Sequence, residues 1–169
     1  HWKILDIGCG YTANKYANVL ADSEDFSKFY KNKNFVLIRD KILPFKDKEF
    51  DFVIASHVIE HIRDVEFFIK ELERISSQGY IEIPSRFSDN LVFDDSENHV
   101  WWFNFDDIKN CLIILKRNQF IKPFMTVSMS MSLRKIFRES FVLELSWQDK
   151  INYEFQHEIE FGEPQKFSL

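Results

Sequence analysis

The chain has 169 residues, of which 45% are hydrophobic and 29% charged; this is the composition of an ordinary globular protein with enough length for one sizeable core. Its net charge is −5 and no block of Lys or Arg occurs, so a nucleic-acid partner is not expected. No apolar run approaches the roughly 20 residues that cross a bilayer, and we find no signal peptide. Cys9 and Cys111 form neither a disulfide framework nor a zinc motif. We therefore expect a cytoplasmic protein that does not bind a membrane.

The first half of the chain alternates strand and helix signals. Apolar segments at residues 2–7, 35–40 and 50–56 predict short strands, and the nearly continuous apolar character of 50–56 is typical of a strand covered on both faces. A further strand is expected at 80–83, before Pro84. This alternation favours an α/β fold with a parallel sheet and right-handed crossovers.

One helix is expected from about Asp64 to Ile75. Its apolar residues recur at helical spacing, and Asp64 can cap the first turn while acidic side chains there complement the helix dipole. The run Ser76-Ser77-Gln78-Gly79 ends the helix.

The second half is less regular. Residues 141–147 and 151–155 alternate in polarity around a Gln-Asp-Lys turn, which suggests a β-hairpin. Residues 99–118 fit either a helix that begins near Asp106 or a second hairpin, and short apolar runs do not distinguish the two. We favour the hairpin. Residues 157–169 are expected to form a loosely held tail.

Two of the four glycines, Gly8 and Gly10, directly follow the first apolar segment. Glycine after a buried strand allows a sharp turn and lets a ligand approach the backbone without meeting a β-carbon. In an open α/β sheet, ligands bind outside the carboxyl ends of the strands, where acids can accept hydrogen bonds from ribose hydroxyls. Asp22 and Asp40 each follow an apolar segment and are candidates for that role.

These residues resemble a known family. The stretch LDIGCG at 5–10 resembles the first motif of class I S-adenosylmethionine-dependent methyltransferases, and LPFKDKEFDFVIASHVIEHI at 43–62 resembles a later motif block of the type-11 branch. The resemblance covers about residues 3–85. It implies a Rossmann-like, mostly parallel, twisted sheet of seven strands with flanking helices, S-adenosylmethionine as the cofactor, and methyl transfer.

The resemblance also implies roles for individual residues. Asp6 and the backbone of Gly8, Cys9 and Gly10 would lie beside the methionyl part of the cofactor, and Asp22 would hold the ribose. Acidic groups suit this ligand, because its methionyl group carries an ammonium and its sulfur is a sulfonium.

The same resemblance places the adenine and the methyl group. Asp40 would face the adenine amino group, which donates hydrogen bonds, with Lys41 and Ile42 beside the ring. Ser56 and His57 would border the transferring methyl group.

The chain departs from the family pattern near the first motif. Thr12 stands where a third glycine is usual, and Asp40 lies one residue closer to the Leu-Pro-Phe motif than is common. Residues 11–18 are fewer than the dozen or so that a parallel crossover requires, so we expect a reduced or lost first helix. In the alternative, a short helix spans 13–20 and the ribose acid is Glu24 or Asp25; we favour Asp22.

The stretch HVIEH at 57–61 raises the question of a metal. It matches the H-x-x-E-H pattern of inverted zinc peptidases, but that reading needs a long helix rather than a position directly after a strand. Some methyltransferases that act on RNA ends or ubiquinone precursors carry E-x-x-E-H here and bind a divalent ion; His57 in place of the first Glu suits magnesium poorly. We favour local hydrogen bonds for Glu60 and His61 and predict no metal.

Methyl transfer requires alignment of the two reactants, and a base only if the acceptor keeps its proton. His57 is the first candidate base and His99, next to Trp101-Trp102, is the second. The expected partner is a small-molecule or glycan-precursor acceptor, by analogy.

Two other functions stay open: a catalytically inactive methyltransferase-fold module for binding or assembly, and a nicotinamide-dependent enzyme.

The expected organisation is a single methyltransferase domain over residues 1–169. Residues 1–85 would form its cofactor-binding half, 86–156 its substrate or cap half with the hairpins, and 157–169 the tail.

Overall fold

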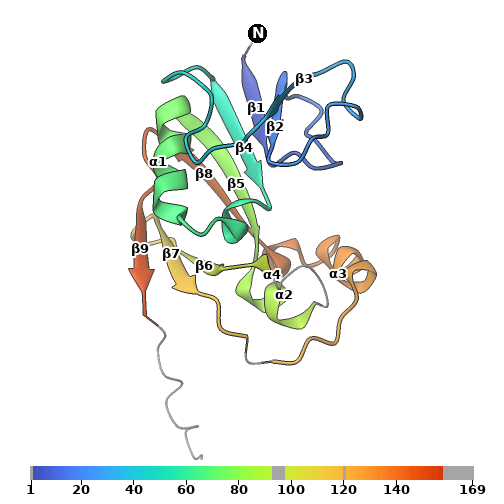
Figure 1. Cartoon of the computed structure of the whole chain (residues 1–169). Coiled ribbons are helices and arrows are strands. Elements are labelled where there is room, and N and C mark those ends of the chain that lie inside the picture. Colours follow the sequence, from blue (N-terminus) through green and yellow to red (C-terminus); the bar gives the residue numbers. More distant parts are fainter. Residues whose placement is uncertain (1, 93–97, 120, 158–169) are drawn as a thin grey trace, which may run out of the picture.

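The computed structural model in Figure 1 describes residues 2–92, 98–119 and 121–157. Its main sheet has the strand order β3-β2-β1-β4-β5-β8. The six strands are β1 (Ile4–Ile7), β2 (Val19–Asp22), β3 (Asn34–Leu37), β4 (Phe52–Ser56), β5 (Gln78–Pro84) and β8 (Val142–Gln148). The first five are parallel, and β8 pairs with β5 in the antiparallel sense. The predicted Rossmann-like α/β fold is confirmed, with six rather than seven strands in this sheet.

The strand order reverses between β1 and β4. From β1 the chain proceeds outward to β2 and β3 and then returns to pair β4 with the other edge of β1. Such a reversal opens a crevice at the carboxyl ends of the two central strands, where doubly wound folds bind ligands. The segments that follow β1, β2 and β4 therefore border the candidate site.

The helix predicted at 64–75 is present as α1 (Val65–Ile75) and lies against one face of the sheet (Figure 1). Its N-cap is Asp64, whose Oδ1 accepts a hydrogen bond from the backbone N–H of Phe67 at 3.3 Å. Its apolar stripe packs on alternate residues of the strands, so the intervening side chains, among them Asp6, point to the opposite face.

A second sheet extends this core. Its order is β6-β7-β9, with β6 (Trp101–Asp106), β7 (Cys111–Lys116) and β9 (Tyr153–Gln156). β6 and β7 form the hairpin that we favoured for 99–118. Phe103, Leu112 and Ile114 from this sheet are buried in the same cluster as the apolar face of α1.

The hairpin predicted for 141–155 is wrong. β8 pairs with β5 in the main sheet, whereas β9 pairs in parallel with β7 in the second sheet. Asp149, with φ of 61°, turns the chain between them, and only an isolated bridge joins Gln148 to Lys150. The two strands therefore link two sheets and do not pair with each other. Of the predicted tail, all but His157 lies outside the described residues.

The first crossover contains no helix among the described residues 11–18, as the short spacing predicts, and the alternative helix over 13–20 is not formed. Turns replace it, and Ala17 and Cys9 pack against Leu20 on the face of the sheet opposite α1. Tyr30 holds this loop, because its hydroxyl donates to the carbonyl of Gly10 at 2.9 Å and accepts from the N–H of Ala13 at 3.0 Å.

Three short helices lie beyond the carboxyl ends of the parallel strands (Figure 1). They are α2 (Arg86–Leu91), α3 (Val127–Arg134) and α4 (Arg138–Phe141), which the sequence did not predict. A small apolar cluster that includes Leu91, Met125 and Phe141 joins them. The crevice therefore lies between the carboxyl ends of the strands on one side and these helices on the other. Within the described residues, no helix is long and apolar enough to cross a membrane.

Candidate functional site

The turn after β1 is built on two left-handed glycines. Gly8 has φ of 69° and Gly10 has φ of 46°, a region that residues with a β-carbon adopt at a cost. The N–H groups of Gly8 and Cys9 donate to the carbonyl of Ala21 at 2.7 and 3.3 Å, so the turn is attached to the neighbouring strand β2. A β-carbon at Gly10 would meet no atom within 4 Å, which leaves its backbone open to a ligand.

Two carboxylates hold this turn. Asp22 accepts a hydrogen bond from the N–H of Gly10 at 2.9 Å on Oδ2 and one from the N–H of Glu24 at 3.0 Å on Oδ1. Asp6 is buried and accepts from the N–H of Asn14 at 2.6 Å. Burial raises the pKa of Asp6 to about 6, against the lowering effect of the Asn14 bond.

Cys9 is buried inside the turn. Burial, together with the negative charges of Asp22 and Asp6, raises the pKa of its thiol to about 12. The thiol is therefore protonated at neutral pH and fills space; it is not a nucleophile.

One cavity of about 520 Å³ lies on the α1 side of the glycine turn. Gly8, Asp22, Asp40 and Lys41 border it, so the structure brings these four predicted residues together. Ile42 is 65% exposed and is not among the residues that line the cavity. The sequence reasoning did not single out its apolar wall, which consists of Ile7, Ile38, Leu43, Val58, Ile62, Phe67 and Phe68.

A second cavity, of about 480 Å³, lies on the other side of Gly8. It is bordered by the remaining predicted residues near the turn and the end of β4, which are Asp6, Cys9, Gly10, Ser56 and His57. Thr12, Tyr80 and Glu82 also line it. Gly8 borders both cavities, so the two lie next to each other on either side of the glycine turn.

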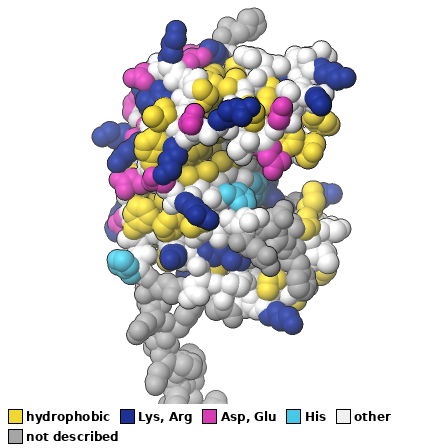
Figure 2. Space-filling view, in the orientation of Figure 1, with side chains coloured by type: hydrophobic (Ala, Val, Ile, Leu, Met, Phe, Trp, Pro, Cys, Tyr) yellow, Lys and Arg dark blue, Asp and Glu magenta, His cyan; other side chains and the backbone are white. Residues whose placement is uncertain are grey.

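A third cavity, of about 240 Å³, lies between the strand ends and α2 and α3. His57 and His99, the two candidate bases, both border it, together with Glu60, His61 and Asp89. Figure 2 shows the molecule hollowed between the main sheet and the helices beyond it, with a histidine side chain exposed in the hollow. His57 also borders the second cavity and His61 the first, so the three cavities meet at the carboxyl end of β4.

His57 occupies a strained position directly after β4, with φ of 56°. Its Nδ1 lies 3.3 Å from Glu60 Oε1 and its Nε2 lies 3.2 Å from Glu82 Oε1. Burial lowers the pKa of His57, but its contacts with the carboxylates of Glu60 and Glu82 outweigh that effect and raise the pKa to about 9. The imidazole is therefore positively charged at neutral pH in this arrangement.

Glu82 is the centre of an ion-pair network on the open face of the sheet. Besides His57, it pairs with Arg134 of α3 at 3.3 Å and with Arg138 of α4, and it accepts from the Tyr80 hydroxyl at 3.0 Å. The hydrogen bond to His57 is the largest cause of its lowered pKa, which is about 2 despite partial burial. This network attaches α3 and α4 to the end of β5.

A second buried carboxylate positions His99. Asp89 of α2 is 4% exposed and bonds to Nδ1 of His99, to Trp102 Nε1 at 2.5 Å and to Arg117 Nε at 2.8 Å. His99 is therefore held through Nδ1 by the Asp89 carboxylate. Glu60, His61 and His99 present ligand atoms that lie within 4.8 Å of one another, a group able to hold a metal ion.

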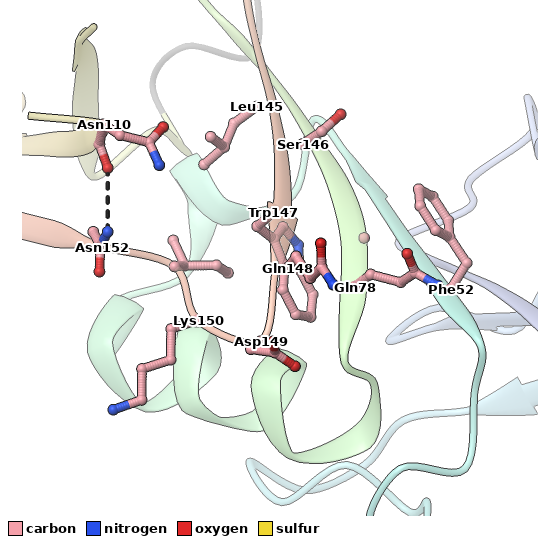
Figure 3. Close-up of a pocket in the computed structure, with 12 residues that line it drawn as sticks. Phe52, Gln78, Asn110, Leu145, Ser146, Trp147, Gln148, Asp149, Lys150 and Asn152 are labelled. Carbon is pink, nitrogen blue, oxygen red and sulfur yellow. Dashed lines mark hydrogen bonds between the residues drawn. The ribbon is translucent and has the colours of Figure 1, made fainter. Parts of the chain in front are cut away.

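A further cavity, of about 680 Å³, lies away from this site (Figure 3). It is lined by Phe52 and Gln78, the first residues of β4 and β5, and by the end of β8 at Trp147 and Gln148. It therefore lies at the amino ends of the parallel strands, whereas doubly wound folds bind cofactors at the carboxyl ends.

The strand order, the glycine turn at the end of β1 and the cavities at the β1–β4 reversal define a Rossmann-like α/β domain with a ligand site at the strand reversal, the arrangement of class I methyltransferase folds. Comparison with known proteins supports this assignment: residues 5–81 match the sequence profile of a family described as a methyltransferase domain. The match spans fewer than half of the residues, so it shows that this part of the chain is similar to methyltransferase domains.

The relatives cover the chain to different extents. Ubiquinone biosynthesis O-methyltransferase of Pelagibacter ubique (strain HTCC1062) is 30% identical over 94 residues, which are 47% of this chain and 39% of that protein, so the chain spans well under half of this relative. Among solved structures, the PH0226 protein of Pyrococcus horikoshii OT3 aligns with 89% of this chain and 82% of its own, at 16% identity and a TM-score of 0.51. The YcgJ protein of Bacillus subtilis aligns with 56% of this chain and 47% of its own, at 20% identity and a TM-score of 0.45. The PH0226 likeness supports the fold alone.

Proposed function

We propose that this protein binds S-adenosylmethionine at the carboxyl ends of β1, β2 and β4 and transfers its methyl group to a small-molecule acceptor. The observation that carries the proposal is the glycine turn, which opens backbone at Gly10 to a ligand and separates two cavities of suitable size at the strand reversal. In this proposal residues 1–85 form the cofactor half of one domain and residues 86–156 its acceptor half.

The residues at the turn fit the chemistry of the cofactor. The larger, mostly apolar cavity would take the adenosine, with Asp22 accepting from the ribose hydroxyls and Asp40 from the adenine amino group. The cavity on the other side of Gly8 would take the methionyl part. There Asp6 is a carboxylate whose pKa is raised by burial and by the negative charge of Asp22, and a ligand ammonium would offset both effects.

The acceptor would enter the third cavity, because that cavity shares His57 with the methionyl cavity and His61 with the adenosine cavity. Bound S-adenosylmethionine supplies an activated methyl group, so the protein mainly has to hold the acceptor in line and exclude water. α2 and α3 would form the cover of this cavity. Its volume of about 240 Å³ suits a small metabolite or the reactive end of a glycan precursor better than a macromolecule.

The direct test is calorimetric titration of the protein with S-adenosylmethionine, S-adenosylhomocysteine and NAD. We expect one site per chain for the first two ligands and none for NAD. If neither S-adenosylmethionine nor S-adenosylhomocysteine binds, the proposal is contradicted and a methyltransferase-fold module without catalysis is favoured. Binding of NAD alone would favour a nicotinamide-dependent enzyme.

A further inference from the structure

The side chains of Glu60, His61 and His99 form a compact cluster from two distant parts of the chain. Glu60 and His61 belong to the short helix η1 (Ile59–His61), directly after β4, and His99 precedes β6. Their ligand atoms all lie within 4.8 Å of one another, and the rings of His61 and His99 meet edge to face with centroids 4.5 Å apart. All three side chains border the 240 Å³ cavity.

Glu60 has no hydrogen-bond partner within the part of the chain that the structure describes. It is 1% exposed, and neither of its carboxylate oxygens makes a hydrogen bond there by strict geometry. The nearest cationic group is the His57 imidazole, with Nδ1 at 3.3 Å from Oε1. We expected local hydrogen bonds to hold Glu60 from the sequence alone. The His57 imidazolium balances part of the buried charge of Glu60, and the two carboxylate oxygens, which make no hydrogen bond in the described part of the chain, keep lone pairs that are available to a metal ion.

His99 is held through one ring nitrogen by a carboxylate, as metal-binding histidines commonly are. His99 bonds to Asp89 through Nδ1, and Asp89 is itself held by Trp102 and Arg117. A carboxylate or a backbone carbonyl on one ring nitrogen fixes the tautomer and directs the other nitrogen toward a metal.

We propose that Glu60, His61 and His99 bind one divalent transition-metal ion of the zinc type, with its open coordination positions toward the 240 Å³ cavity. Two imidazoles and one carboxylate are a donor set that catalytic zinc and related first-row ions accept with three protein ligands. Magnesium prefers oxygen ligands and octahedral geometry, so this donor set disfavours it. None of these three ligands is among the residues that we assign to S-adenosylmethionine.

Metal binding is tested on the chelator-treated, full chain by titration with Co²⁺, whose visible absorption reports coordination by protein nitrogen. We expect one ion per chain, displacement by one equivalent of Zn²⁺, and no displacement by a large excess of Mg²⁺. His61→Ala and His99→Ala should weaken binding by about 100-fold or more, and Asp89→Asn, which acts through His99, by about 10–100-fold. His157→Ala, an exposed histidine after β9, is the matched control and should bind as the parent does.

Glu60→Gln separates loss of the site from loss of the fold. The amide has the same shape, and Glu82 still pairs with His57 in this variant, so it should fold in the absence of metal. Zn²⁺ should raise the melting temperature of the parent but not of Glu60→Gln. An unchanged Co²⁺ spectrum and affinity in Glu60→Gln, or full displacement by Mg²⁺, would overturn the proposal. The experiment uses neither cofactor nor acceptor, so its result is independent of the proposed methyl transfer.

Discussion

Gly8 lies so close to Val58 that a β-carbon on Gly8 would stand 2.2 Å from Val58 Cγ2, well inside contact distance. This approach joins the turn after β1 to the segment after β4 across the strand reversal. Gly10, only two residues away, has the same left-handed backbone but faces open space. The two glycines therefore serve different purposes, the first for packing and the second for access.

Substitution by alanine should distinguish these purposes. Gly10→Ala should cost about 1–2 kcal/mol of unfolding free energy, from backbone strain alone, and should weaken S-adenosylmethionine binding because its methyl group enters the ligand space. Gly8→Ala adds overpacking against Val58 and should cost about 3 kcal/mol or more. Urea denaturation measures both. Equal destabilisation by the two substitutions would show that the contact between Gly8 and Val58 is not the constraint.

Asp22→Ala should weaken S-adenosylmethionine binding by about 1.5–3 kcal/mol, since charge-assisted hydrogen bonds to the ribose would be lost. It also removes the acceptor for the N–H of Gly10. Asp25→Ala is the matched control, because Asp25 is an exposed acid in the same loop that does not border the cavity. Calorimetry on both variants decides between the candidate ribose acids. A loss of affinity in Asp25→Ala with normal affinity in Asp22→Ala would reverse our assignment.

The sequence predicted the local features of the fold well. Apolar runs that end at Gly8 or at Ser56 indicate buried parallel strands, and Asp64 indicates the start of α1, because these signals depend on neighbours in sequence. The partner of β8 could not be predicted in this way. Its alternation suits pairing with either β5 or β9, and strand pairing depends on packing between distant segments.

The candidate site likewise has one part that the sequence predicted and one part that it did not. The glycine turn and the acids after the strands are contiguous motifs, so the resemblance located them. The cluster of Glu60 with His99 joins residues 39 positions apart, and the anchoring of His99 by Asp89 depends on α2, which has no periodic signal. Nothing in the spacing of these residues indicates that they meet.

Glu71 on α1 connects the helix to the loop that borders the adenosine cavity. Its buried carboxylate accepts from the N–H of Leu43 at 2.7 Å and from Arg74, whose guanidinium also donates to the carbonyls of Leu43 and Phe45. Glu71→Gln should lower the unfolding free energy by about 1.5–3 kcal/mol, because a charge-assisted pair is lost in a buried place. Chemical denaturation provides the measurement.

Glu66→Gln on the same helix is the control for that experiment. Glu66 pairs with Lys70 at 2.8 Å on the solvent side, and both side chains are half exposed or more. Such a pair contributes only about 0.2–0.5 kcal/mol. If the two substitutions have the same effect, the interior pair does not hold the loop against the helix.

Asp6 should make cofactor binding depend on pH. Burial raises its pKa to about 6 in the folded chain, above the ordinary value of 3.8, so the protonated acid is favoured by folding and the unfolding free energy should fall as pH rises from about 4 to 6. A ligand ammonium instead favours the carboxylate, so affinity for S-adenosylmethionine should fall below pH 6 by up to about tenfold per pH unit and stay level just above it. Asp22 faces Asp6 and contributes to the raised pKa, so Asp22→Asn should shift this midpoint slightly downward. Asp6→Asn should remove the dependence and bind weakly at every pH. Calorimetry from pH 5 to 8 is the measurement, and a parent affinity that does not change below pH 6 would place the ammonium away from Asp6.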